Sequence, residues 1–304
     1  MVMEMAESIT TGPIATEPPA SRALDLLDTG PAVEAVLAGQ AQVHQAVQAA
    51  QAEIGRAVDL LTRAYLAGGR LLLLGAGTSG RLAVQEAVEV PGTYGIPADR
   101  IQARVAGGGP AHLVGTDAAE DDVELGRADL RELRVGPTDA LIAVAASGRT
   151  PYTCAAAALA RELGAGVVTI TNLRGSELAA LADVAIEVPV GDEVVAGSTR
   201  LAAGTAQKLV LNTLTTTTMI RLGRVHENYM VDVVAANDKL RRRVSGVVAA
   251  STGHTDEQAW QALQRCDWNA RAAIVHLATG LEPAAAAERA AAHRTVRQAI
   301  EAVR

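Results

Sequence analysis

Residues 71–93 read LLLLGAGTSGRLAVQEAVEVPGT, and this segment sets the expectation for the whole chain. The apolar run Leu71–Leu74 predicts a short strand that is buried on both sides. The glycine-rich turn at 75–77 leads into a helix expected over 79–90, ending before Pro91. A strand, a glycine turn and a helix N-terminus bring unpaired backbone N–H groups and the positive end of the helix dipole to one point. The segment therefore predicts an anion site.

The glycine turn fits more than one kind of ligand. Residues 75–80 match G-x-G-x-x-G, the dinucleotide fingerprint, which also needs an acidic residue at the end of the next strand. The next expected strand, near 101–105, runs into the sequence AGGG at 106–109, which has no acid. Thr78 and Ser79 place two hydroxyls in the turn, which suits a small phosphate monoester. We favour a phosphosugar over a dinucleotide, and a tight turn without a ligand is the third interpretation.

The composition narrows the class of protein. The chain has 304 residues, of which 49% are hydrophobic and 20% charged, an ordinary globular balance. Phe is absent and aromatic residues total 2%, so little is available for stacking on bases. The formal charge of −7 also disfavours nucleic acid and anionic membrane surfaces as partners.

The reactive side chains show no metal or redox pattern. Cys154 and Cys266 are far apart and read as buried thiols in a reducing cytosol. The six histidines are scattered, and no zinc or Ser–His–Asp spacing is present. Glu4 and Glu7 interrupt the N-terminus, which does not resemble a signal peptide, and no apolar run reaches the ~18 residues of a membrane span. We therefore expect a cytoplasmic protein with no metal site and no membrane segment.

Strand and helix signals alternate along the middle of the chain. Strands are expected at 70–75, 101–106, 139–146, 167–172 and 184–189, and helices at 79–90, 111–117, 151–163 and 176–182. The third and fourth strands are continuous apolar runs, which is typical of parallel strands covered on both faces. The alternation predicts an α/β fold, a parallel sheet flanked by helices in three layers, with ligands at the carboxyl ends of the strands.

Helical patterns flank this alternating part. They lie at 31–67, at 198–222, from a capping box at Thr255, and at 267–278 and 283–303. We divide the chain into an N-terminal arm and helix (1–45), a phosphosugar-binding domain (46–238) and a small C-terminal helical subdomain (239–304).

Two further turns carry hydroxyl groups. Capping explains Thr150 and Pro151 at the start of the helix after the third strand, but it explains neither Ser147 nor Gly148. The segment 197–200, GSTR, opens the long helix. Three hydroxyl-rich helix starts indicate a phosphosugar site better than one does. The expected substrate contacts are Thr78, Ser79, Ser147, Gly148, Thr150, Ser198 and Thr199.

Acidic side chains supply the candidate acid–base groups. The run 117–122, DAAEDD, has the composition of a solvated face. Glu86 and Glu89 share one face of the first helix, and we expect Glu86 to be a surface acid. Glu89, which comes just before Pro91, is the stronger candidate for chemistry.

Several long motifs together resemble the bacterial N-acetylmuramic acid 6-phosphate etherases. They are GAGTSGRL at 75–82, E-x-P-x-T-Y-G at 89–95, AASGRTPY at 145–152, GSTRL-x-AGTAQK at 197–208, and MVDV at 230–233 with Asn237 and Lys239-Leu240. The resemblance runs from about Thr16 into the C-terminal helices.

The resemblance implies a sugar isomerase (SIS) fold of the flavodoxin-like type and cytoplasmic dimers without a metal or organic cofactor. Family members cleave the lactyl ether of N-acetylmuramic acid 6-phosphate to N-acetylglucosamine 6-phosphate and D-lactate, in peptidoglycan recycling. The catalytic glutamates of the family fall on Glu89, assigned here as the acid toward lactate, and Glu120, assigned as the base at C2. Asp117 joins the expected substrate contacts.

The chain departs from the family pattern around both glutamates. It has AAED at 118–121 where Gly-Ala-Glu-Asp is common, and VEVPG at 88–92 where Ser-Glu-Cys-Pro-Pro is common. Two alternatives share this fold. One is a non-catalytic phosphosugar sensor similar to the glucokinase regulatory proteins, which are about twice as long, and the other is an aldose–ketose isomerase. Release of lactate separates the three functions.

Overall fold

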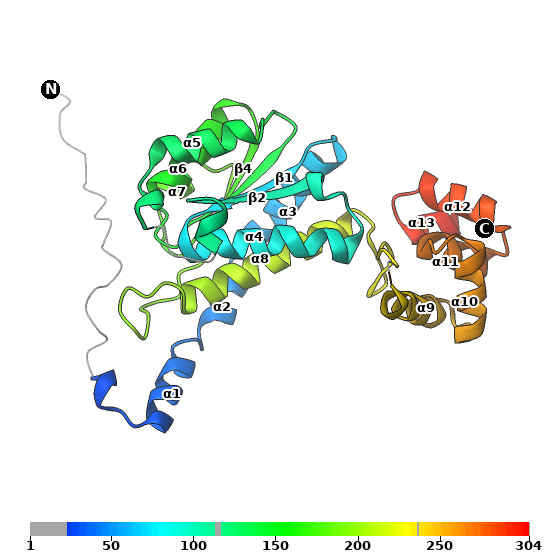
Figure 1. Ribbon diagram of the computed structural model, residues 1–304, viewed down its shortest axis with the longest axis horizontal. Helices are drawn as coiled ribbons and strands as arrows, with labels where there is room; N and C mark the ends of the chain where they lie inside the picture. Colours follow the sequence, from blue (N-terminus) through cyan, green and yellow to red (C-terminus); the bar gives the residue numbers. More distant parts are fainter. Residues whose placement is uncertain (1–22, 113–116, 236, 304) are drawn as a thin grey trace.

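A five-stranded parallel sheet forms the centre of the computed structural model, which describes residues 23–112, 117–235 and 237–303 (Figure 1). In spatial order the strands are β2 (Ile101–Val105), β1 (Leu71–Gly75), β3 (Ala140–Val144), β4 (Gly166–Thr171) and β5 (Val184–Glu187). β1 and β3 are buried along their whole length, as their apolar runs predict. The predicted strands and the parallel α/β fold are confirmed.

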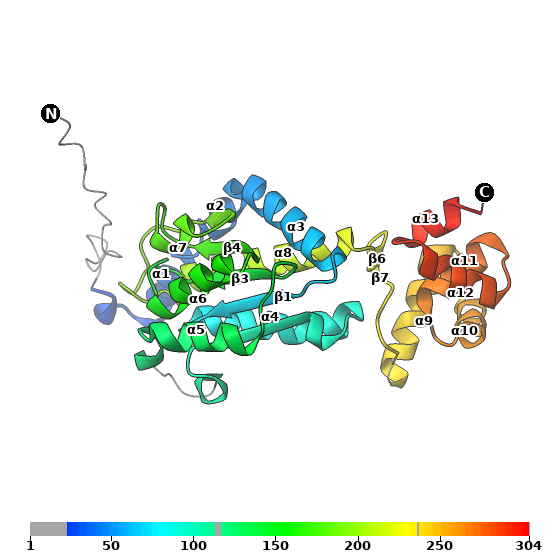
Figure 2. The ribbon, with the colours of Figure 1, turned by 90° about the horizontal axis from the view of Figure 1, so that it is seen from above.

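Helices cover both faces of the sheet and complete three layers (Figure 2). Alternate side chains of β1 serve opposite faces, since Leu71 and Leu73 join one hydrophobic core and Leu72 and Leu74 join the other. The first face carries α3 (Gln51–Leu66), α4 (Gly77–Tyr94) and α8 (Ala202–Arg221), and the second carries α5 (Val123–Glu132), α6 (Pro151–Glu162) and α7 (Glu177–Ala180).

α4 is longer than its local sequence predicts. The expected end before Pro91 is wrong, because the helix continues through this proline and loses only the hydrogen bond of the missing N–H. The Thr93 hydroxyl donates to the carbonyl oxygen of Glu89 at 2.8 Å. The helix ends at Gly95, whose φ is 62° and where a Cβ would lie 1.9 Å from the carbonyl oxygen of Asp232. Gly95 therefore ends the helix in the left-handed conformation, and the close approach of Asp232 leaves no room for a side chain there.

Two other predicted helices also differ. Of the expected helix 111–117, residues 113–116 lie outside the described part, and 3₁₀ turns flank them at η3 (Gly109–His112) and η4 (Asp117–Glu120). The long helix was expected from residue 198, but α8 begins at Ala202. The Glu193 carboxylate accepts the N–H groups of Ala202 and Ala203 at 2.9 Å each, which fixes this later start.

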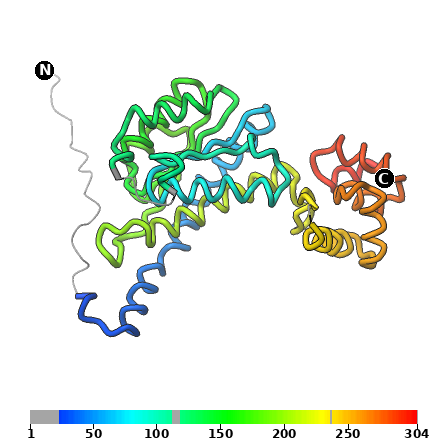
Figure 3. Tube along the Cα trace, in the orientation of Figure 1, coloured from blue at the N-terminus to red at the C-terminus, as the bar shows by residue number. Residues whose placement is uncertain are grey.

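The N-terminal helical segment is divided. A short turn, η1 (Leu24–Leu26), precedes α1 (Thr29–Ala38), α2 (Val43–Ala49) and α3. α1 extends away from the layers, as the tube in Figure 3 shows. Its side chains Val33 and Leu37 are 53% and 67% exposed. The predicted irregular arm at 1–22 lies outside the described residues.

The segment after α8 builds a separate helical cluster at one end of the molecule (Figures 1 and 2). Its elements are β6 (Val225–His226), β7 (Tyr229–Met230), α9 (Asp238–Thr252), α10 (Asp256–Arg265), α11 (Ala270–Thr279), α12 (Pro283–Ala292) and α13 (Val296–Glu301). The short turn η2 (Ala98–Arg100) belongs to the sheet domain, where it precedes β2. The predicted capping box at Thr255 is confirmed, and the helix expected over 283–303 is two helices. Arg271 joins the cluster to the end of α8 by donating to the carbonyl oxygen of Gly223 at 2.9 Å.

Candidate functional site

The hydroxyl-bearing turns after β1 and β3 lie side by side. Thr78 and Ser79 open α4 directly after β1, and Ser147, Gly148 and Thr150 lie between β3 and α6. β1 and β3 are hydrogen-bonded neighbours in the sheet, so their carboxyl ends bring both turns to the same edge. The first N–H groups of a helix have no partner within it, and at this edge they point toward the space outside the strands.

Ser79 is the end of a buried hydrogen-bond chain. Its hydroxyl donates to Oε1 of Gln207 at 2.9 Å, and Nε2 of Gln207 donates to Oδ1 of Asn172 at 2.9 Å. Nδ2 of Asn172 donates to the carbonyl oxygen of Val188 at 2.9 Å. The sequence pattern names Ser79 but neither amide, although Gln207 is part of the AGTAQK motif.

The turn after β3 presents two hydroxyl groups, those of Ser147 and Thr150. Thr150 occupies the predicted N-cap position of α6, but its side chain makes no capping hydrogen bond. The Ser147 hydroxyl accepts the N–H of Arg149 at 3.3 Å, so its proton is not used by that contact. Both side chains are half-buried and therefore reachable by a ligand at this edge.

The start of α8 already holds a carboxylate. Glu193, which is 6% exposed, accepts two backbone N–H groups there. Ser198 and Thr199 lie in the turn before the helix. A cavity of about 240 Å³ lies beside this turn, lined by Asn172, Glu193 and Thr199 among others. An anion at the first N–H groups of α8 would have to displace Glu193.

The two catalytic candidates lie on exposed parts of the chain. Glu89 is exposed on α4 and accepts a hydrogen bond from Gln85 at 3.1 Å. It follows Ser79 by ten residues, which is about 15 Å along the helix axis. Glu120 ends η4 and is also exposed, while the side chain of Asp117 lies outside the described part. The fold of one chain therefore does not place Glu89 beside the hydroxyl turn that opens its own helix.

The expectation that Glu86 is a surface acid is wrong. Its side chain is 3% exposed and faces α8. It receives hydrogen bonds from Lys208 at 3.2 Å, from Asn212 at 2.7 Å and from the Thr215 hydroxyl. The packing of α4 on α8 buries this carboxylate and supplies its donors, which come from a segment more than 120 residues away.

The sequence matches one domain family and several named relatives. Residues 37–172 match the SIS domain family. The chain is 46% identical to the N-acetylmuramic acid 6-phosphate etherase of Rubrobacter xylanophilus, over 90% of this chain and 91% of that protein. The etherase of Symbiobacterium thermophilum is also 46% identical, over 92% of this chain and 91% of its own length. The chain belongs to the N-acetylmuramic acid 6-phosphate etherase family.

The fold has a counterpart among solved structures of other proteins. A phosphoheptose isomerase from Francisella tularensis superposes with a TM-score of 0.51 at 18% identity, covering 64% of this chain and all of that one. This likeness concerns the SIS fold. The resemblance to the etherases and the expected SIS fold are thus both confirmed.

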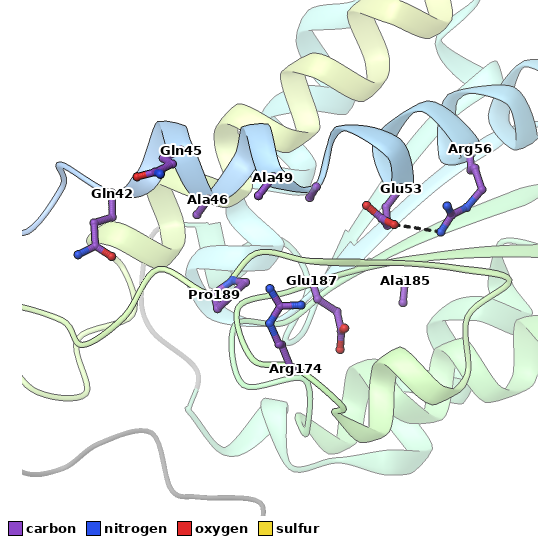
Figure 4. A pocket seen from close by; sticks show the side chains of 11 residues that line it. Gln42, Gln45, Ala46, Ala49, Glu53, Arg56, Arg174, Ala185, Glu187 and Pro189 are labelled. Carbon is purple, nitrogen blue, oxygen red and sulfur yellow. Dashed lines mark hydrogen bonds and ion pairs between the residues drawn. The ribbon is translucent and has the colours of Figure 1, made fainter.

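A larger groove of this etherase-family chain lies elsewhere, along the outer edge of β5 (Figure 4). It has a volume of about 570 Å³ and lies between that edge and α2–α3. Its charged lining is balanced, with Glu53 and Glu187 against Arg56 and Arg174. Because it contains none of the hydroxyl turns, we place the candidate site at the ends of β1 and β3.

Metal ligands do not cluster in the described part of this family member. Within residues 23–112, 117–235 and 237–303, no group of three or more His, Cys, Asp or Glu side chains has an arrangement that could hold a metal ion. Among the helices of the same residues, none has both the length and the apolar character needed to cross a bilayer.

Proposed function

We propose that this chain is a carbon–oxygen lyase that cleaves the lactyl ether of N-acetylmuramic acid 6-phosphate. The products would be N-acetylglucosamine 6-phosphate and D-lactate, in peptidoglycan recycling in the cytoplasm. The observation that carries the proposal is the 46% identity to relatives of that name over about nine-tenths of the chain. The hydroxyl turns at one sheet edge suit the phosphate, which backbone N–H groups and hydroxyls bind well.

The proposed chemistry needs two carboxyl groups. Opening of the sugar ring exposes the C1 aldehyde, which acidifies the proton on C2. Glu120 removes that proton, its electron pair forms the C2–C3 double bond, and the C3–O bond to lactate breaks. Glu89 protonates the departing oxygen. Water then adds at C3 while a proton returns to C2. Such positioned acid–base groups typically contribute ~10²- to 10⁴-fold each.

We also propose that the working unit is a homodimer. About 15 Å separates Ser79 from Glu89 along α4, which exceeds the reach of one hexose phosphate. A second copy could place its Glu89 opposite the hydroxyl turns of the first. α1 supports this arrangement, because Val33 and Leu37 expose apolar surface that a partner chain would cover.

Turnover in D₂O tests the reaction and the roles together. The wild type should release D-lactate and place deuterium at C2 of N-acetylglucosamine 6-phosphate. Glu120→Gln should lose both lactate release and exchange at C2, whereas Glu89→Gln should lose lactate release and keep some exchange. Glu124→Gln makes the same change at an exposed position of α5 and should behave as the wild type.

Each contrary result has a definite meaning. A wild type that binds the substrate without releasing lactate would favour the non-catalytic phosphosugar sensor. Isomerisation of an aldose phosphate without lactate would favour the isomerase. Normal turnover by both glutamine variants would refute the catalytic pair.

A further inference from the structure

We infer that Gln207 is a positioning residue that acts on the phosphosugar site through the hydroxyl of Ser79. The inference rests on the function proposed for that site. Gln207 lies on α8, Ser79 on α4, and Asn172 follows β4, so one hydrogen-bond chain joins three segments that meet at the carboxyl edge of the sheet.

A backbone carbonyl fixes the direction of every hydrogen bond in this chain. The oxygen of Val188 can only accept, so the amide nitrogen of Asn172 must face it. The amide oxygen of Asn172 is left to accept from Nε2 of Gln207. Oε1 of Gln207 then faces Ser79, whose hydroxyl must donate to it. Neither amide can flip without opposing like groups, so the Ser79 proton points inward and its lone pairs remain to accept a hydrogen bond from a hydroxyl or amide N–H group of the sugar rather than to bind the phosphate.

Burial stabilises this hydrogen-bond chain. Gln207 is 1% exposed, Asn172 7% and Ser79 8%. A buried polar group that loses its hydrogen-bond partner still bears its full desolvation cost. Each side chain in the chain of hydrogen bonds therefore stabilises the orientation of its neighbour. Gln207 is one of the buried residues of α8, together with the apolar residues Ala203, Ala206 and Val210. An apolar residue of similar volume would meet the packing need, so the amide is needed for its hydrogen bonds to Ser79 and Asn172.

A double-mutant cycle tests whether Gln207 works through Ser79. The variants are Gln207→Met, Ser79→Ala and their combination, and the probe is N-acetylglucosamine 6-phosphate, followed by calorimetry. Each single change should weaken binding about tenfold, and the combination should be no weaker than the worse single variant. Steady-state kinetics should show a raised KM with kcat within about twofold of the wild type. Gln102→Met, the same change on β2, should have no effect.

Two results of the double-mutant cycle would overturn the positioning role of Gln207. Weakening of about a hundredfold in the combined variant would mean independent effects and would overturn the inference, as would unchanged binding by Gln207→Met. If thermal unfolding shows that Gln207→Met does not fold, Asn172→Asp takes its place, because it sets an oxygen against the Val188 carbonyl at the far end of the chain.

The proposed reaction and this inference fail separately. A wild type that binds the sugar phosphate but releases no lactate contradicts the reaction alone, and the cycle can still be measured. A wild type that binds no sugar phosphate overturns the positioning role as well, because Ser79 then has no ligand to meet.

Discussion

Glu86 and Lys208 form an ion pair across the interface of α4 and α8, with 3.2 Å between carboxylate oxygen and ammonium nitrogen. The carboxylate side chain is 3% exposed and the lysine side chain 29%, so the pair extends from the core toward water. Asn212 and Thr215 add two more donors from α8. The Glu86 carboxylate thus links α4, which carries Ser79, to α8, which carries Gln207.

Removing this carboxylate should destabilise the fold. Glu86→Ala leaves buried donors without an acceptor, and we expect the free energy of unfolding to fall by about 2–3 kcal/mol, less than the ~3–5 kcal/mol for a fully buried pair because Lys208 can reach water. Glu86→Gln keeps an acceptor and should lose about 1 kcal/mol. Denaturant unfolding measures both. Glu89→Gln, three residues on and exposed, should change stability by less than about 0.5 kcal/mol, and an equal loss there would contradict the assignment.

Gly148 should not tolerate a methyl group. Its φ is 61°, and a Cβ would lie 2.2 Å from Oγ of Ser176. Gly175 has nearly the same φ, 62°, and no atom lies within 4 Å of the point that a Cβ would occupy there. Gly175→Ala should therefore cost only the backbone term of about 1–2 kcal/mol. Gly148→Ala should cost about 1–3 kcal/mol more from overpacking and weaken sugar phosphate binding. Equal unfolding midpoints for the two variants would refute this contrast.

Acid should lower the free energy of unfolding through protonation of Asp139, which directly precedes β3. Burial pushes the pKa of this carboxyl up, but hydrogen bonds from the Arg70 side chain and from backbone N–H groups of Gly136 and Arg70 bring it below its ordinary 3.8. The unfolded chain then binds the proton more readily. The resulting stability is present above about pH 3.8 and is lost as the pH falls through the lower folded pKa.

Asp139→Asn should remove that part of the acid sensitivity. Its free energy of unfolding should fall less steeply than that of the wild type between about pH 4 and pH 2. Urea unfolding across that range is the measurement. Asp59→Asn, at an exposed position of α3, should retain the wild-type slope, and a wild-type slope in Asp139→Asn would refute the prediction.

The exposed face of α1 should carry the dimer contact. The double change Val33→Asp and Leu37→Asp should raise the dimer dissociation constant at least tenfold, because burying one such side chain contributes about 1.5–3 kcal/mol. Sedimentation equilibrium measures the constant. Leu163→Asp, at a position 40% exposed at the end of α6, is the matched control. A double variant that stays as dimeric as the wild type would place the contact elsewhere.

Patterns local in sequence were predictable to a large extent. The strands were recognisable because a parallel strand covered on both faces is a continuous apolar run, as in residues 140–144. The Thr255 capping box needs only four consecutive residues. The end of α4 was missed because a proline usually stops a helix, whereas this helix continues through Pro91 to the left-handed Gly95.

In the candidate site, too, local features were predictable and long-range contacts were not. The hydroxyl turns could be predicted, since a glycine turn after a strand has a local signature. The partners of Ser79 and Glu86 could not, because Gln207 and Lys208 approach them from more than 120 residues away. Nothing in the local pattern of α4 distinguishes buried Glu86 from exposed Glu89.

The amino-acid order by itself determined the strands, the glycine turns and the etherase-family motifs, because each depends on neighbours within a few residues. Only the tertiary structure decided which polar side chains are buried and paired. Burial depends on which helix faces which, and the packing of α8 on α4 turned Glu86 inward, left Glu89 in water and directed the Ser79 proton to Gln207.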